Sequence, residues 1–152
     1  MKNIQIDTSV ENFIENNIIY TKRDNIYLEN IGMYIYPKIR ESLLDLYKEF
    51  KKDNRISKKN YYDLMINHGL NLIEKKKNNL SLDDYNKWLS MQESDFICKT
   101  EDIILCIPQL RIDTINKINN LEKDLYKKNN KTTIYNVAFY LACMDLKNKK
   151  DL

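Results

Sequence analysis

The sequence predicts a mainly helical protein made of two diverged copies of one module, each with a strand and two longer helices. Its 152 residues include only two glycines and two prolines, which leaves few positions for tight turns and argues against an all-β fold. Apolar residues recur at three- and four-residue steps along most of the chain, which is the spacing of a buried helix face. The chain also resembles itself after a shift of about 71 residues, and such self-similarity indicates a repeated unit.

The self-similarity is clearest around the two prolines. The shift sets YIYPKIRESLLDLYKEF, residues 34–50, over LCIPQLRIDTINKINNL, residues 105–121. It aligns Pro37 with Pro108, and apolar residues coincide along the helix-like runs that follow. A strand-like segment that ends in a proline is therefore the centre of each copy.

The flanks of these segments set the limits of the two copies. Downstream, 57–62 lies over 130–135, because the second copy carries about two extra residues before its last helix. We divide the chain into a first module, 1–80, and a second module, 81–152, and expect the two to share one core.

The first module is predicted to begin with a short helix and a strand. A helix over 8–17 places Phe13 on its apolar face. Met33–Tyr36 is aromatic and β-branched, as strands are, and it stops at Pro37 because proline cannot donate to a strand ladder.

Two helices follow in the first module. Proline fits the first turn of a helix, so we expect a helix from Pro37 to about Lys52. Ser57 is a typical N-cap residue and opens a second helix whose apolar stripe reaches Ile73. The polar stretch 74–79 is predicted to be the linker between the modules.

The second module is predicted to repeat this order. Ser81 caps a first helix, and 103–107 is an aliphatic strand. The next helix begins at Pro108 or at Asp113, and the last and most apolar helix begins at Thr132.

The repeated unit resembles the ribbon-helix-helix modules of a family of small DNA-binding repressors. The resemblance rests on a strand, a proline, an amphipathic helix, a basic turn and a serine-capped apolar helix, and it covers 32–73 and 103–147. It implies that the two strands pair as a two-stranded antiparallel ribbon that enters the DNA major groove, while the second helices contact phosphates through their N-termini. One chain would then fold as a pseudo-dimer with an extra N-terminal helix in each module.

The resemblance also implies which side chains would contact DNA. Strand alternation points Met33 and Ile35 toward the core and leaves Tyr34 and Tyr36 outward, where tyrosine hydroxyls can bond bases or phosphates. The basic run around the junction of the two helices, and the N-termini of both second helices, would contact phosphates. The candidate DNA-binding residues are Tyr34, Tyr36, Lys38, Arg55, Ser57, Lys58, Lys59, Lys131, Thr132 and Thr133.

The second strand departs from the family pattern. The same alternation leaves Ile103, Leu105 and Ile107 outward, and an aliphatic surface reads bases only through thymine methyl groups. The neighbouring Glu101 and Asp102 would repel phosphates. Either this strand is shifted by one residue, which exchanges its two faces, or its outer face is buried against something else.

Two functions from different classes follow from these patterns. The first is a sequence-specific DNA-binding regulator or accessory factor of plasmid or phage type, with double-stranded DNA as its partner. The alternative is a protein-binding module or inhibitor that uses the same scaffold without contacting DNA. Ile103, Leu105 and Ile107 are the interaction candidates for that alternative, whether the partner is another protein or a second copy of the chain.

No sequence pattern predicts catalysis. The chain has no phosphate-binding glycine loop, nucleophile elbow or metal motif, and its single His68 lacks ligand-like spacing to acids or cysteines. We therefore expect no enzyme activity, cofactor, metal or small-molecule substrate. Three cysteines without a metal-binding pattern are typical of reduced thiols, and no apolar run approaches the ~18 residues of a membrane span. A cytoplasmic protein without membrane contact is expected.

Overall fold

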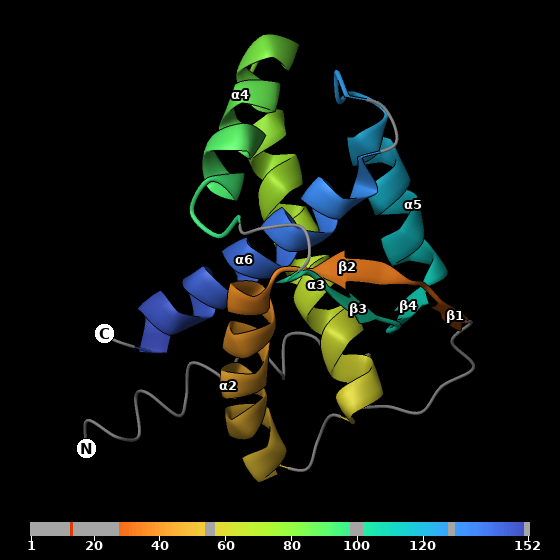
Figure 1. The fold of residues 1–152 in the computed structure, drawn as a ribbon, viewed down its shortest axis with the longest axis vertical. Coiled ribbons are helices and arrows are strands. Elements are labelled where there is room, and N and C mark those ends of the chain that lie inside the picture. Colours follow the sequence, from red (N-terminus) through yellow and green to blue (C-terminus); the bar gives the residue numbers. More distant parts are fainter. Residues whose placement is uncertain (1–12, 14–27, 54–56, 98–101, 128–129, 151–152) are drawn as a thin grey trace.

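The computed structural model describes residues 13, 28–53, 57–97, 102–127 and 130–150, and it confirms a mainly helical fold with short antiparallel strand pairs that precede helices (Figure 1). The elements in chain order are β1 (Leu28–Asn30), β2 (Met33–Ile35), α2 (Pro37–Asp53), α3 (Lys58–Lys77), α4 (Leu82–Glu93), β3 (Ile104–Cys106), β4 (Gln109–Arg111), α5 (Ile112–Glu122) and α6 (Lys131–Lys150). The helix predicted over 8–17 lies outside the described residues, except for Phe13, which is helical and buried.

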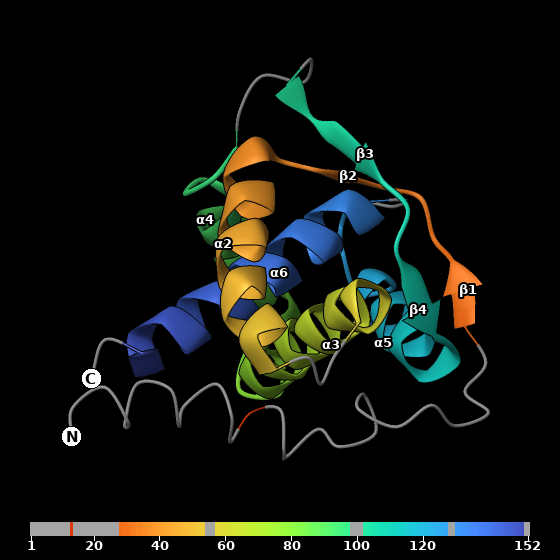
Figure 2. The ribbon, with the colours of Figure 1, turned by 90° about the horizontal axis from the view of Figure 1, so that it is seen from below.

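The strands of the two predicted modules pair with each other. β2 is antiparallel to β3, and β1 is antiparallel to β4. The two pairs share one register. Four residues forward from Asn30 on one strand and four residues back from Gln109 on the other lead to the facing pair Tyr34 and Leu105. The N–H of Ile31 also donates to the carbonyl of Pro108 at 2.9 Å between the two pairs. The four strands therefore form one bent antiparallel ribbon, which Figure 2 shows at the edge of the helices.

The register of the ribbon agrees with the shift that aligns the two copies. Tyr34 faces Leu105, and these two residues are counterparts in the alignment of the modules. Met33 faces Cys106, which is the counterpart of Ile35, and Ile35 faces Ile104, which is the counterpart of Met33. A residue that faces its own counterpart lies on a local twofold axis, as in a symmetric dimer. The ribbon is thus arranged as a pseudo-dimer requires.

The phase predicted for the first strand is confirmed for β2 but is wrong for Tyr36. Met33 and Ile35 are buried and Tyr34 is 53% exposed, whereas Tyr36 is only 7% exposed. The strand ends at Ile35, so the alternation of faces does not extend to Tyr36. Tyr36 instead precedes α2, where its carbonyl accepts from the N–H groups of Ile39 and Arg40.

Two element boundaries differ from the sequence prediction. The alternative helix start at Pro108 is wrong, because Gln109–Arg111 pairs with β1 as a strand before α5 begins at Ile112. The predicted linker 74–79 is also too long, since α3 continues to Lys77. Its last turn is rich in lysine, and cations are favourable at the negative end of a helix dipole.

Serine caps open two helices as predicted. The Ser57 hydroxyl accepts a hydrogen bond from the N–H of Asn60, and the Ser81 hydroxyl accepts one from the N–H of Asp84. Each serine has an extended backbone and satisfies one of the N–H groups that the first turn leaves without an intrahelical partner.

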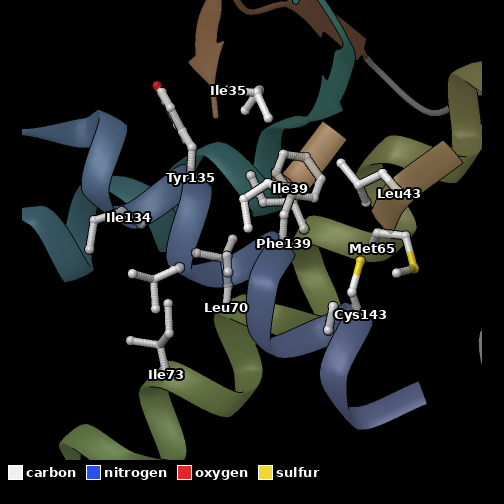
Figure 3. Close-up of a cluster of buried hydrophobic side chains, with 14 of the residues drawn as sticks. Ile35, Ile39, Leu43, Met65, Leu70, Ile73, Ile134, Tyr135, Phe139 and Cys143 are labelled. Atoms are coloured by element: carbon white, nitrogen blue, oxygen red, sulfur yellow. The ribbon is translucent and has the colours of Figure 1, made fainter. Parts of the chain in front are cut away.

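Helices α3 and α6 cross at the centre of the molecule (Figure 1). Each contains 20 residues, and they belong to different predicted modules. Gly69 permits the close approach, because a Cβ atom at this position would lie 1.8 Å from the carbonyl oxygen of Ala138. Side chains from β2, α2, α3 and α6 meet around this crossing, as Ile35, Ile39, Leu70 and Phe139 show in Figure 3. The buried cluster therefore contains residues from both predicted modules.

The two crossing helices also hold the two chain segments that lead into α2 and α5. Asn136 Oδ1 accepts a hydrogen bond of 3.0 Å from the N–H of Tyr36, directly before α2. Asp63 Oδ1 accepts one of 2.9 Å from the N–H of Arg111, directly before α5. Asn136 and Asp63 are each the sixth residue of their helix, and each bonds a segment of the other module. The same interaction thus occurs twice, as two copies of one module predict.

The crossing predicts that Gly69→Ala destabilises the fold although alanine is the better helix former. The gain in helix propensity is about 1 kcal/mol. Overpacking costs about 1–3 kcal/mol, and the upper end of this range applies here, because the added carbon meets backbone that cannot rotate away. We expect a net loss of about 2 kcal/mol in unfolding free energy, measured by urea denaturation. Gly32→Ala is the control, because its Cβ would lie 3.9 Å from Leu105; an unchanged midpoint for Gly69→Ala would contradict the prediction.

Removing the Asn136 side chain should also destabilise the protein. Besides accepting from Tyr36, its amide donates to the carbonyls of Tyr34 and Thr132 at 2.9 Å each. Each buried polar group left without a partner costs about 1–3 kcal/mol. Asn136→Ala is therefore expected to lower the thermal midpoint clearly, whereas Asn116→Ala, on the exposed surface of α5, should change it little. Equal effects of the two changes would show that the hydrogen bonds of Asn136 contribute nothing specific.

Candidate nucleic-acid interface

The outer face of the ribbon combines apolar and carboxamide side chains. Its residues have the parity of exposed Tyr34 on one strand and of exposed Leu105 on the other, opposite to the side that faces the helices. Three facing pairs have this parity, Leu28 with Arg111, Asn30 with Gln109, and Tyr34 with Leu105. Gly32 and Ile107 have the same parity and lie between the two strand pairs, next to the hydrogen bond from Ile31 to Pro108.

The phase predicted for the second strand is confirmed for Leu105 and Ile107, which are 54% and 63% exposed. The alternative of a one-residue shift is therefore wrong. The outward placement of Ile103 is also wrong, because this residue precedes the strand and its half-buried side chain packs against the core. Asp102, just before it, is exposed, and Glu101 lies outside the described residues.

A groove of about 590 Å³ runs beside β3 and β4 and reaches the N-terminus of α3. One wall carries the ribbon residues Leu105, Ile107 and Gln109. The other wall carries the exposed cations Arg40, from α2, and Lys58, from the first turn of α3. The groove therefore places positive charge directly beside the outer face of the ribbon.

The cations of this groove affect the pKa of the Cys106 thiol. Burial raises the pKa of Cys106, and the positive charges of Arg40 and Lys58 oppose that increase. Burial likewise raises the pKa of Tyr62, which lines the same groove, and Arg40 again opposes the increase. Both cations therefore act on groups of the groove wall, where an anion would experience attraction.

The N-terminus of α3 adds to the positive character of the groove. Ser57 satisfies one N–H of the first turn, and the other N–H groups there lie at the positive end of the helix dipole. Ser57 and Lys58 are exposed, as the sequence prediction requires. Predicted Arg55 lies outside the described residues, and of Lys59 only the place in the first turn of α3 is described.

The N-terminus of α6 has a different environment. Thr133 is buried and donates its hydroxyl to Glu93 Oε2 at 2.8 Å, so a carboxylate from α4 already lies at this helix end. The carbonyl of Thr132 accepts from Asn136, and Lys131 is exposed. The structure thus keeps Lys131 at the surface but does not bring Thr133 there.

Two further predicted DNA contacts lie away from the groove beside β3. Tyr36 packs its ring against Phe96, with 5.6 Å between the ring centres. Lys38 is exposed, and its ammonium donates to the carbonyl of Asp95 at 3.4 Å. It lines a separate hollow of about 370 Å³ that also contains the carboxylates of Asp45 and Asp95.

Sequence reasoning missed Asn30, Gln109 and Arg40 as members of this surface. One of the two predicted helix starts, at Pro108, places Gln109 in a helix, and Asn30 follows a stretch without clear periodicity. β4 has only three residues, of which Leu110 is buried, and an alternation over so short a run gives no recognisable sequence signal.

The single histidine of the chain lies beside a carboxylate. His68 Nε2 lies 2.8 Å from Asp145 Oδ2, in a partly buried pair between α3 and α6. Within the described ranges, no three His, Cys, Asp or Glu side chains are grouped so that they could hold a metal ion. In the same ranges no helix has both the length and the apolar character needed to cross a membrane.

Comparison of the chain with protein-family models, with curated proteins and with solved structures gave no match.

Proposed function

We propose that the protein binds double-stranded DNA, with the outer face of the ribbon in the major groove. The observation that carries this proposal is the groove in which Arg40, Lys58 and the N-terminus of α3 lie beside the exposed ribbon residues. Regulation of transcription, as by a plasmid or phage repressor or accessory factor, is the role that such binding would serve.

The dimensions of the ribbon support this mode of binding. Paired strands lie about 5 Å apart, and the major groove is about 12 Å wide, so it admits a two-stranded ribbon with its side chains. When the ribbon lies on the base edges, cations at its side face the sugar-phosphate backbone. Arg40 and Lys58 would take that position, because they line the groove beside the ribbon on helices of the first module. Contacts of this kind position a protein on DNA, whereas the ribbon side chains read the bases.

The two flanks of the ribbon are not equivalent in this proposal. The flank at the α3 N-terminus has two cations and an open first turn. On the other flank the Glu93 carboxylate lies at the α6 N-terminus and would repel a phosphate, while Lys131 attracts one. Phosphate binding is therefore expected to be stronger on the α3 flank.

Protein binding without DNA contact is the second candidate function. The observation that favours it is the exposure of Leu105 and Ile107 on a short strand. Burial of such side chains stabilises a complex by about 25 cal/mol per Å² of apolar surface. The partner would be a protein with an apolar surface or a second copy of the chain.

Lys58→Ala is expected to weaken binding to all duplex sequences alike. Loss of one phosphate contact should reduce the slope of log affinity against log salt concentration by roughly one unit. The measurement is a fluorescence anisotropy titration of a mixed-sequence duplex at several salt concentrations. Lys75→Ala is the matched control, because Lys75 is exposed near the other end of the same helix, about 25 Å away. Equal slopes for wild type and Lys58→Ala would remove Lys58 from the interface.

Leu105→Lys separates the two candidate functions. If the ribbon lies in the DNA groove, the added cation should tighten binding to a mixed-sequence duplex, particularly at low salt. If the exposed strand binds protein, wild-type chain should not bind DNA, and Leu105→Lys should abolish any self-association seen by sedimentation. Circular dichroism checks that the variant folds. We expect its spectrum to match that of the wild type, because the Leu105 side chain is exposed. Weaker DNA binding by a folded variant would count against the proposed position of the ribbon.

A further inference from the structure

We infer that the ribbon prefers a duplex segment rich in A·T base pairs and reads it from the major groove. This inference rests on the proposed function, because it concerns the bases that the same surface would contact. It follows from the chemistry of six residues of the outer face, four of which line the groove beside β3 and β4. The six residues are Asn30, Gly32, Tyr34, Leu105, Ile107 and Gln109.

The two carboxamides favour adenine. Asn30 and Gln109 face each other across the ribbon, and both line the groove beside β3 and β4. A carboxamide has a donor and an acceptor side by side, and it can bond the N6 amino group and the N7 of adenine together. Guanine presents two acceptors, N7 and O6, at the same edge, so one half of the carboxamide would be left without a partner.

The aliphatic side chains favour thymine. Leu105 and Ile107 are more than half exposed and lie on the same face as the carboxamides. Thymine is the DNA base that presents a methyl group in the major groove, and apolar side chains contact it favourably. Cytosine presents its N4 amino group instead, which an aliphatic side chain cannot accept. The aliphatic outer face of the second strand, which departs from the ribbon-helix-helix pattern, would therefore suit A·T pairs.

Between the pairs Asn30–Gln109 and Tyr34–Leu105, the outer face lacks the side chains that read guanine. Arginine and lysine bond guanine N7 and O6, and neither residue occupies these six positions. Arg111 has the same parity at the end of the ribbon, but its side chain is only 20% exposed and lies 3.9 Å from the carboxylate of Asp113. Arg40 and Lys58 lie beside the strands on the helices, where they suit phosphates rather than base edges. Gly32 adds no side chain between these groups, so the ribbon backbone can approach the bases there.

The two halves of the ribbon carry different side chains, although the ribbon backbone is pseudo-symmetric. Tyr34 differs from its counterpart Leu105 at the local axis, and the counterparts of Gly32 and Ile107 are Ile103 and Tyr36. The two halves would therefore contact different bases. A symmetric homodimer with the same backbone would read a palindrome. This chain should instead read an A·T-rich segment without twofold symmetry.

The test uses three duplexes of about 20 base pairs, titrated with the full chain by fluorescence anisotropy at the same salt concentration. They consist of alternating A·T, alternating G·C and alternating I·C pairs. Inosine lacks the 2-amino group of guanine, so I·C resembles A·T in the minor groove and G·C in the major groove. We expect A·T to bind at least about fivefold more tightly than both others, since a bidentate contact is worth about that or more.

A variant assigns the preference to the outward carboxamides. Asn30→Ala combined with Gln109→Ala should reduce the ratio of A·T to G·C affinity at least severalfold. Asn119→Ala combined with Asn120→Ala removes two exposed carboxamides on α5 and should keep the wild-type ratio. Equal thermal midpoints of the two double variants establish that folding is not the cause. A ratio that Asn30→Ala with Gln109→Ala leaves unchanged overturns the inference.

The outcomes with wild-type protein separate the inference from the proposed function. Salt-dependent binding of all three duplexes with equal affinity overturns the A·T preference and leaves DNA binding intact. Equal affinity for A·T and I·C above G·C overturns it as well, because such a preference comes from the minor groove. Failure to bind any duplex, even at low salt, overturns the proposed function itself.

Discussion

The crossing of α3 and α6 is the contact on which the other features of the structure depend. Gly69 has no side chain, so the backbone of α3 lies directly against the carbonyl of Ala138. Protein interiors are close-packed, and helices in backbone contact have little freedom to slide or rotate against each other. The crossing therefore sets where every other residue of the two helices lies, including the acceptors that reach the strands.

The position of the ribbon follows from this crossing. Asn136 and Asp63 lie one and a half turns into their helices, where they accept from the N–H groups just before α2 and α5. Each bond ties a helix of one module to a strand end of the other module. The groove beside β3 is composite for the same reason, because Leu105 comes from the second module and Lys58 from the first. A surface of this composition exists only while the two modules are packed together.

Sequence patterns predicted the features that depend on local physics. Three- and four-residue periodicity located the helices, and a serine before an apolar run marked the caps at Ser57 and Ser81. Strands of three residues have too few side chains for a periodic signal, and β1 and β4 exist because each is the other's partner. Two contacts of predicted DNA-binding residues were equally unpredictable, those of Lys38 with Asp95 and of Thr133 with Glu93. Only the tertiary fold brings these partners close.

The differences between the modules are as informative as their likeness. In a homodimer of identical chains every substitution appears twice, once on each side of the axis. Two copies within one chain can change separately, and the N-termini of α3 and α6 have different surroundings. Lys58 and Arg40 flank the first, whereas the Glu93 carboxylate contacts the second. The strand facing β2 is aliphatic where β2 carries Tyr34. A pseudo-symmetric backbone with two unlike faces suits an asymmetric target, because each half can meet a different chemical surface without a compromise between them.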